Sequence, residues 1–315
     1  MTNTSSVWRQ IAGWAAVAAS TGFACMWAWW GSIENFHEGW YHQTIWRNIG
    51  LMLVQYLSPM LIVIVVSAVA FCWPRLALPL MGASAIAAAW YFGRFRISSA
   101  AVLLIAIPLV LLGVLYHFGR PQPRKWAWRC LIGLPLVTAV ASGAYPGWMA
   151  VHRFDDGNYG MRLVEGNGVI LVWAPEGPGW PDSGVTWQSA MQNCADLTLD
   201  GHSLAGSPQN VWRLPTVDEA VRSLVFRGAN AGGMWEPNFH RAQYRITPDK
   251  DSPLWKVHSQ VIYWWTSTEA GRDRAYYITN NGYVQVVPKR IRPDYLAFRC
   301  VTEPAKVSLL QVDHR

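Results

Sequence analysis

Acidic residues are nearly missing from the first half of this 315-residue chain. Residues 1–150 contain only Glu34 and Glu38, against nine Lys or Arg, whereas residues 151–315 hold 17 acids and 17 bases. The whole net charge of +7 therefore lies in the first half. Its basic residues flank apolar stretches and form no cluster on a folded domain, which argues against nucleic acid as a partner.

Charged residues are also absent from five long apolar stretches within residues 1–150. A helix needs about 20 mostly apolar residues to cross a bilayer, a length that four stretches meet and one approaches. The sequence thus predicts a multi-pass α-helical membrane region whose partner is the lipid bilayer. Because no stretch holds Asp, Glu, Lys or Arg, and the lone His117 has no visible partner in the sequence, an internal proton relay is not expected. The predicted helices cover 11–30, 51–73, 76–92, 98–118 and 130–149.

The basic residues between these stretches predict an orientation. Cytoplasmic loops carry an excess of Lys and Arg, and the run "GRPQPRKWAWR" (119–129) is the most basic loop. Five crossings from a cytoplasmic N-terminus place this run inside and residues 151–315 outside. The "GRFR" loop at 93–96 departs from the rule. If 76–92 were only re-entrant, four crossings would return the C-terminus to the cytoplasm.

The second half has the pattern of a mixed α+β domain over 151–315. Strands are predicted at 168–176, 261–269, 274–288 and 295–303, with "NNG" marking a hairpin turn. Helices are predicted from two amphipathic stretches, 185–201 and the stretch after Thr216, and the chain between 229 and 258 is expected to be irregular. Thr186 or Ser183 can cap the first helix, and Thr216 with Glu219 forms a T-x-x-E capping box for the second.

Cysteine is scarce, with five residues in the chain and only Cys194 and Cys300 in the second half. In an oxidising compartment these two can pair, and closing a loop of this length is worth about 4–5 kcal/mol. The alternative is a pair of buried free thiols. Cys25, Cys72 and Cys130 lie in or beside the apolar stretches and are expected to act as small apolar residues.

A set of motifs in the second half resembles a known family. The stretches "TWQSAMQNCADL", "VWRLPTVDEAVRSLV", "YWWTSTE", "AYYITNNGYVQVV" and "AFRCV" occur in the order found in the Lcl C-terminal domain family of bacteria. The resemblance covers about residues 160–303. It implies a C-type-lectin-like fold related to the formylglycine-generating, sulfatase-modifying enzymes. It also implies a Cys194–Cys300 disulfide between the first helix and the last strand, with Trp212 and Leu214 in the core.

Together with the predicted topology, the resemblance suggests a protein of the bacterial inner membrane. Its N-terminus would be cytoplasmic and its C-terminal domain periplasmic.

Catalytic signatures are missing from the domain. The sequence contains no nucleophile elbow, P-loop or dinucleotide-binding glycine pattern, and no His or Cys cluster with metal-site spacing. His202, His240 and His258 are scattered. Formylglycine-type chemistry needs reactive thiols, and Cys194 and Cys300 occupy scaffold positions. We therefore expect a non-catalytic domain without a cofactor, with a sulfatase-modifying-type enzyme as one alternative.

One tripeptide is typical of lectins that bind sugar through calcium. "WEPNF" (235–239) contains Glu-Pro-Asn, which binds sugar through calcium in true C-type lectins. Here it precedes the central strands rather than following them. Glu236 and Asn238 are also too few oxygen ligands for calcium, which takes six to eight. They are weak metal candidates.

A recognition role is the remaining expectation for the second half. Loops carry most binding residues, and the candidate contacts in the predicted loops are Trp235, Trp255, Asn281 and Tyr283. The ligand would be a cell-envelope glycan or an envelope protein. Packing of these aromatic residues within the loops is the structural alternative. A membrane transport or envelope-assembly component, in which the helices carry the function, is the alternative function.

Overall fold

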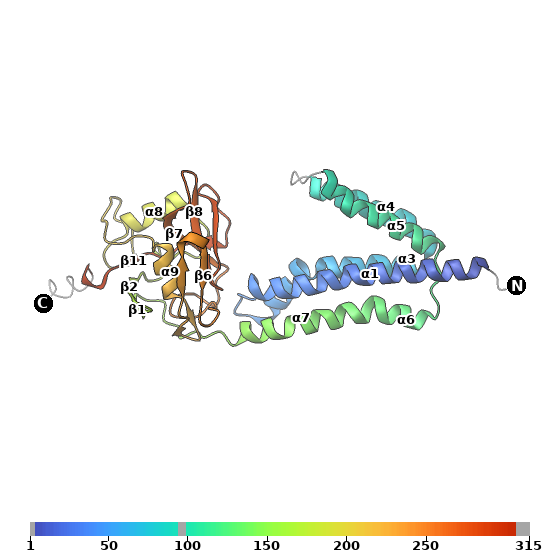
Figure 1. Cartoon of the computed structure of the whole chain (residues 1–315), viewed down its shortest axis with the longest axis horizontal. Helices are drawn as coiled ribbons and strands as arrows, with labels where there is room; N and C mark the ends of the chain where they lie inside the picture. The colour runs from blue at the N-terminus through green and yellow to red at the C-terminus, as the bar shows by residue number, and fades with distance from the viewer. Residues whose placement is uncertain (1–3, 94–98, 307–315) are drawn as a thin grey trace. The chain divides into compact units, whose positions relative to one another are not determined.

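The structure is a computed structural model that describes residues 4–93 and 99–306 (Figure 1). Its internal contacts divide the chain into two compact units. The N-terminal unit contains residues 1–40 and 44–150, and the C-terminal unit contains residues 41–43 and 151–315. Most of the "GRFR" loop, residues 94–96, lies outside the described residues, so its side of the membrane stays a prediction.

The N-terminal unit is built from helices, and all five predicted apolar segments are helical. The first helix is longer than predicted, because it continues through an expected loop as far as His37. The helical elements are α1 (Thr4–His37), α2 (Ile45–Leu51), η1 (Met52–Tyr56), α3 (Ser58–Cys72), α4 (Pro74–Gly93), α5 (Ser99–Phe118), α6 (Arg124–Trp128), η2 (Arg129–Gly133) and α7 (Leu134–Val151).

The second predicted segment is bent rather than straight. The helical stretch Ile45–Tyr56 meets Ser58–Cys72 at an angle of 61°. Pro59 explains the break, because its ring cannot donate the backbone hydrogen bond of a continuous helix and clashes with the preceding turn. The π-helical turn η1 lies directly before the bend.

Length and composition identify fewer crossings than the five predicted. Among the described residues, Val7–His37 and Arg124–Val151 are each long and apolar enough to cross a membrane. The bent pair adds a third crossing if it is counted as one span. Helix α4 is not among these candidates, and the described apolar part of α5, Ala106–Phe118, is shorter than a span. The five-crossing topology remains a prediction.

Small residues allow the N-terminal helices to pack closely. Ala24 and Ala28 of α1 are fully buried in a cluster with Met60 of α3. Gly113 of α5 lies against Met81 of α4, where an added Cβ would be 3.1 Å from the Met81 Cβ. Close backbone approach at Gly and Ala is typical of helices that associate in lipid.

The C-terminal unit contains two main sheets and two short hairpins. The first sheet has the order β1-β2-β11 and the second the order β10-β7-β8-β9. In the second sheet β10 pairs in parallel with β7, and the other neighbours are antiparallel. The strands are β1 (Arg162–Gly166), β2 (Val169–Trp173), β3 (Val225–Phe226), β4 (Ala229–Asn230), β5 (Met234–Glu236), β6 (Arg241–Gln243), β7 (Tyr263–Glu269), β8 (Arg274–Thr279), β9 (Val284–Pro288), β10 (Leu296–Ala297) and β11 (Val301–Thr302).

Three expectations about the strands need correction. The strand expected at 168–176 is β2, but it belongs to a hairpin with β1 whose turn is Asn167–Gly168, both at positive φ. The stretch 229–258 is not wholly irregular, since it contains β4 and the β5–β6 hairpin. The strand expected at 295–303 is split into β10 and β11 by Phe298–Cys300.

Both predicted helices are present and capped by the expected residues. Helix α8 (Trp187–Asp196) starts at Thr186, whose side chain accepts a hydrogen bond from the Ser189 amide at 3.2 Å. It ends earlier than the predicted limit because Leu197 is extended and pairs with Leu204. Helix α9 (Val217–Ser223) has the complete Thr216–Glu219 capping box.

Candidate functional site

The cysteines of the C-terminal unit form the disulfide Cys194–Cys300, which joins residues 106 apart in sequence. Both are fully buried in a core cluster that also contains Trp212 and Leu214, as the resemblance implied. The crosslink fixes α8 against the segment between β10 and β11. A sulfur held in a disulfide is neither a nucleophile nor a metal ligand, so this pair is a scaffold feature.

A buried arginine, Arg299, joins several loops of the C-terminal unit. Arg299 is 0% exposed, and its guanidinium lies 3.5 Å from the centroid of the Trp180 ring. Its Nε donates to the Ala174 carbonyl at 2.8 Å, and its Nη1 donates to the Pro253 and Leu254 carbonyls at 2.7 and 2.8 Å. Burial lowers the pKa of this group. Arg299 thereby cross-links loops that are far apart in sequence.

Asp251 ties the start of the C-terminal unit to the β3–β4 turn. Its carboxylate oxygens accept hydrogen bonds from the amides of Phe154 and Arg227, each at 2.7 Å. Burial raises the pKa of Asp251 to about 6, although these two hydrogen bonds favour the ionised form. The neighbouring Lys250 is also buried, which lowers its pKa, and its Nζ donates to the Ser259 carbonyl.

Trp255 lies in the core and is not available at the surface. It is 1% exposed, and its ring stacks on Trp264 with centroids 3.7 Å apart and an interplanar angle of 13°. Trp255 was predicted to contact a ligand, but the structure shows the alternative, in which this aromatic residue packs inside the domain. Sequence reasoning placed it in a loop, but long-range packing against β7 decides its burial.

Trp235 is half-buried in the middle of β5, where it pairs with Ala242 of β6. Its ring meets Tyr276 of β8 edge to face, with centroids 5.8 Å apart. His240, at the end of the connecting turn, stacks on the same tyrosine, and the Tyr276 hydroxyl is hydrogen bonded to its Nδ1. These two contacts fix the β5–β6 hairpin to β8 of the second sheet.

Asn281 and Tyr283 lie in the β8–β9 turn, as the "NNG" motif predicted. The Tyr283 amide donates to the Thr279 hydroxyl at 2.8 Å, and this hydroxyl donates in turn to the Asn281 side chain. These bonds hold the turn in one shape while the Tyr283 side chain remains 66% exposed.

The two hairpins are joined directly. The Tyr244 hydroxyl, just after β6, donates to the Gly282 carbonyl at 3.0 Å. Gly282 has φ +87°, and a Cβ there would lie 2.5 Å from the Tyr244 ring, so only glycine allows this contact. Burial raises the pKa of Tyr244.

Large apolar side chains are exposed on these joined hairpins. We call this set the hairpin surface: Met234, Phe239, Ile246 and Tyr283. Phe239 is 75% exposed, the highest fraction among them. Exposed Arg241 and Arg245 lie in the same chain segment. Sequence reasoning found Tyr283 but missed the three others, although the turn residues around Phe239 were a usable signal.

The residues weighed for metal binding are not gathered into a ligand set. Glu236 accepts a hydrogen bond from the Gln243 side chain at 2.7 Å, and Asn238 is exposed in the short turn after β5. In the described part of the chain, one group of three has ligand atoms within 4.8 Å of one another: Glu34, His37 and Glu38, near the end of α1. It lies in the other unit and was not selected from the sequence.

The structure also shows a charged cluster that the sequence did not indicate. Lys256 is nearly buried, and its Nζ lies 2.7 Å from Glu176 and 2.8 Å from Asp182. Its ammonium lies over the Trp180 ring, and His258 lines a hollow beside it. The positive charge of Lys256 is balanced by the two carboxylates. We therefore interpret the cluster as a contact that fixes the surrounding loops.

No protein-family model, curated protein or solved structure matches the chain. The site must therefore be interpreted from its own chemistry.

Proposed function

We propose that the chain is a membrane-anchored recognition protein whose C-terminal unit is an extracytoplasmic, non-catalytic binding domain of the C-type-lectin-like type. The hairpin surface carries this proposal, because it presents exposed apolar side chains on a base fixed by Tyr244 and Tyr276. A rigid base with protruding anchors is the usual arrangement of a binding site. The lectin-like assignment draws support from the disulfide between α8 and the end of the domain.

Two features support the extracytoplasmic side. Disulfides persist in oxidising compartments such as the periplasm and are rare in the cytosol. The run of basic residues at 119–129 favours the cytoplasm for the opposite end of the helices. An odd number of crossings is required, which is met by three spans with the bent pair counted as one, or by the five predicted.

The chemistry of the hairpin surface favours a protein ligand over a glycan. Met234, Phe239 and Ile246 offer no strong hydrogen-bonding side-chain group to sugar hydroxyls. They suit the apolar centre of a protein interface, in which aromatic residues and Arg are the common anchors. Exposed Arg241 and Arg245 favour a partner surface that also carries acidic groups.

A photo-crosslinking experiment in the native membrane tests this function. A benzophenone amino acid replaces Phe239 or Tyr283 in the full chain, and the matched control carries it at Leu204, which is exposed on a different loop. We expect a discrete protein adduct from positions 239 and 283 and none from 204. The adduct should disappear when Arg241 and Arg245 are both changed to Gln.

The other outcomes separate the alternatives. Absence of an adduct, combined with retention of the protein by purified peptidoglycan, contradicts a protein ligand and supports a glycan ligand. Equal adducts at all three positions indicate random collision and contradict a specific surface. A specific adduct obtained only from positions in the N-terminal helices favours the envelope-assembly alternative.

A further inference from the structure

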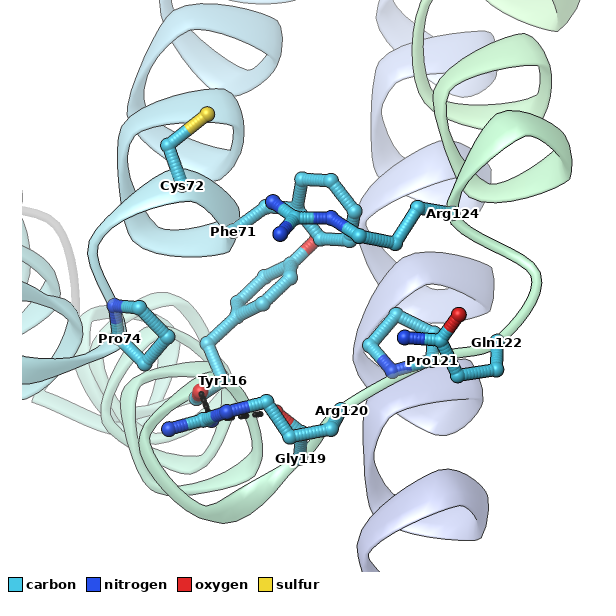
Figure 2. A pocket seen from close by; sticks show the side chains of 9 residues that line it. All are labelled: Phe71, Cys72, Pro74, Tyr116, Gly119, Arg120, Pro121, Gln122 and Arg124. Carbon is cyan, nitrogen blue, oxygen red and sulfur yellow. Dashed lines mark hydrogen bonds between the residues drawn. The ribbon is translucent and has the colours of Figure 1, made fainter.

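A basic cavity lies at the end of the N-terminal unit that contains the 119–129 run. It has a volume of about 160 Å³ and is enclosed by the end of α3, the start of α4, the end of α5 and the start of α6 (Figure 2). Figure 2 shows the Arg120 and Arg124 side chains on two sides of the cavity, with the Tyr116 ring between them. The lining residues are Phe71, Cys72, Pro74, Tyr116, Gly119, Arg120, Pro121, Gln122 and Arg124.

The turn 119–122, which lines the cavity, is held in place by contacts with α1. The Arg120 amide donates to the Arg9 carbonyl at 2.7 Å, and the Gln122 carbonyl accepts from the Trp14 indole at 2.9 Å. Pro121 packs so tightly on Gly13 that a Cβ there would lie 2.4 Å from the proline ring. The two arginines are therefore presented by a fixed turn.

Both guanidinium groups have donors to spare. Every hydrogen bond of the Arg120 side chain runs from Nη1 to carbonyls of its own turn, which leaves Nε and Nη2 without an acceptor among the described residues. Arg124 lies over the Phe71 ring at 4.8 Å and makes no hydrogen bond or ion pair within residues 4–93 and 99–306. A guanidinium offers five N–H donors in a planar fork that matches a phosphate.

Within residues 1–150, no carboxylate competes for these arginines. The only acids of residues 1–150 are Glu34 and Glu38, which lie at the far end of α1. Arg9, Arg75 and Lys125 add further exposed positive charge around the cavity. The occupant suited to this chemistry is an anionic group small enough for the cavity, with a phosphate as the best match.

The surrounding aromatic residues indicate where that phosphate comes from. Trp8, Trp73 and Trp126 are all exposed in the segments that meet at the cavity. Exposed tryptophans at helix ends concentrate at the headgroup level of a bilayer. An opening at that depth faces lipid phosphates, and basic pockets between helices on the cytoplasmic side bind anionic headgroups.

We propose that this cavity binds the phosphate of an anionic phospholipid of the cytoplasmic leaflet through Arg120 and Arg124. The inference rests on the membrane insertion that is part of the proposed function, and it adds a lipid site to a unit that otherwise acts as an anchor. The phosphate oxygens of the bound lipid accept hydrogen bonds from the spare donors of both arginines.

Native mass spectrometry of the full chain tests the proposal. The protein is reconstituted in nanodiscs of phosphatidylcholine containing a minor fraction of phosphatidylglycerol and is released in the spectrometer. We expect one phosphatidylglycerol to remain bound. The double variant R120Q/R124Q should bind it roughly twenty-five-fold more weakly, since each arginine near the membrane surface contributes about fivefold. The matched control K125Q removes a neighbouring charge that does not line the cavity, so it should weaken binding by no more than about fivefold.

Cys72 provides a second readout, because its thiol is exposed and lines the cavity. In a chain with C25S and C130S, a maleimide should label Cys72 more slowly in discs that contain phosphatidylglycerol than in pure phosphatidylcholine. R120Q/R124Q should abolish this protection in the same discs, whereas K125Q should preserve it. The comparison in identical discs removes the effect of surface potential on the thiol.

Each contrary result has a distinct meaning. If R120Q/R124Q retains the lipid as well as K125Q does, the cavity is not the site and the inference is wrong. If millimolar inorganic phosphate protects Cys72 in pure phosphatidylcholine discs as well as the lipid does, the ligand is free phosphate and the lipid is excluded. A chain that fails to enter the discs contradicts the membrane anchor and this inference together, whereas the first two results leave the anchor intact.

Discussion

Replacing Arg299 by methionine should destabilise the C-terminal unit strongly. Methionine keeps an unbranched apolar stem but is shorter and cannot donate, so the buried carbonyls of Ala174, Pro253 and Leu254 would lose their donors. At the low end of about 1 kcal/mol for each unsatisfied group, these carbonyls cost about 3 kcal/mol. Loss of the cation–π contact with Trp180 adds about 2 kcal/mol, and relief from burying a cation offsets part of the sum.

A net loss of about 3 kcal/mol in the free energy of unfolding is therefore expected. The assay is urea unfolding of the segment 151–315 with its disulfide intact, followed by tryptophan fluorescence. The core clusters of this unit draw only on residues between Tyr159 and Val301, so the segment is expected to fold alone. Arg290→Met is the control, since Arg290 is exposed and should change stability by less than about 0.5 kcal/mol. If Arg299→Met were as stable as this control, the loops would not depend on the buried guanidinium.

Two further predictions concern the same unit. Changing Cys194 and Cys300 together to Ala should lower its stability by about 5 kcal/mol, because the crosslink closes a loop of 106 residues in the unfolded chain; an unchanged urea midpoint would contradict this. Because of Asp251, the free energy of unfolding should fall as pH rises from about 4 to 6. The pKa of this carboxyl is about 6 in the folded state and exceeds its pKa in the unfolded chain, so ionisation costs more free energy in the folded state. The decrease, at most about 3 kcal/mol, should be missing from Asp251→Asn, and equal pH profiles of the two proteins would show that this carboxyl is not responsible.

Local signals in the sequence predicted the local features of the fold. The capping box of Thr216 and Glu219 spans four residues, and the structure forms it as expected. The disulfide between Cys194 and Cys300 is confirmed as well. It could be predicted because this half of the chain holds no other cysteine. The Asn167–Gly168 turn carried the same kind of local signal, and the β1–β2 hairpin was therefore within reach of the sequence.

Features that depend on distant parts of the chain could not be obtained in this way. Trp255 lies in a loop by its local sequence, but its ring is covered because Trp264 of β7 stacks on it. In the sequence, Arg299 is one residue of the motif "AFRCV". Its role in joining loops comes from hydrogen bonds to carbonyls up to 125 residues away. The hairpin surface depends on the contact between Tyr244 and Gly282, which joins two turns that no local pattern relates.

The side of the membrane on which the C-terminal unit lies is the central claim, and protease accessibility in intact spheroplasts tests it most directly. Trypsin added outside should cleave after Arg272, which is exposed in the loop before β8, while a cytoplasmic marker stays intact. The cleaved products should remain linked on a non-reducing gel, because Cys194 and Cys300 lie on opposite sides of that loop. Protection of the C-terminal unit until the membrane is broken would contradict the account.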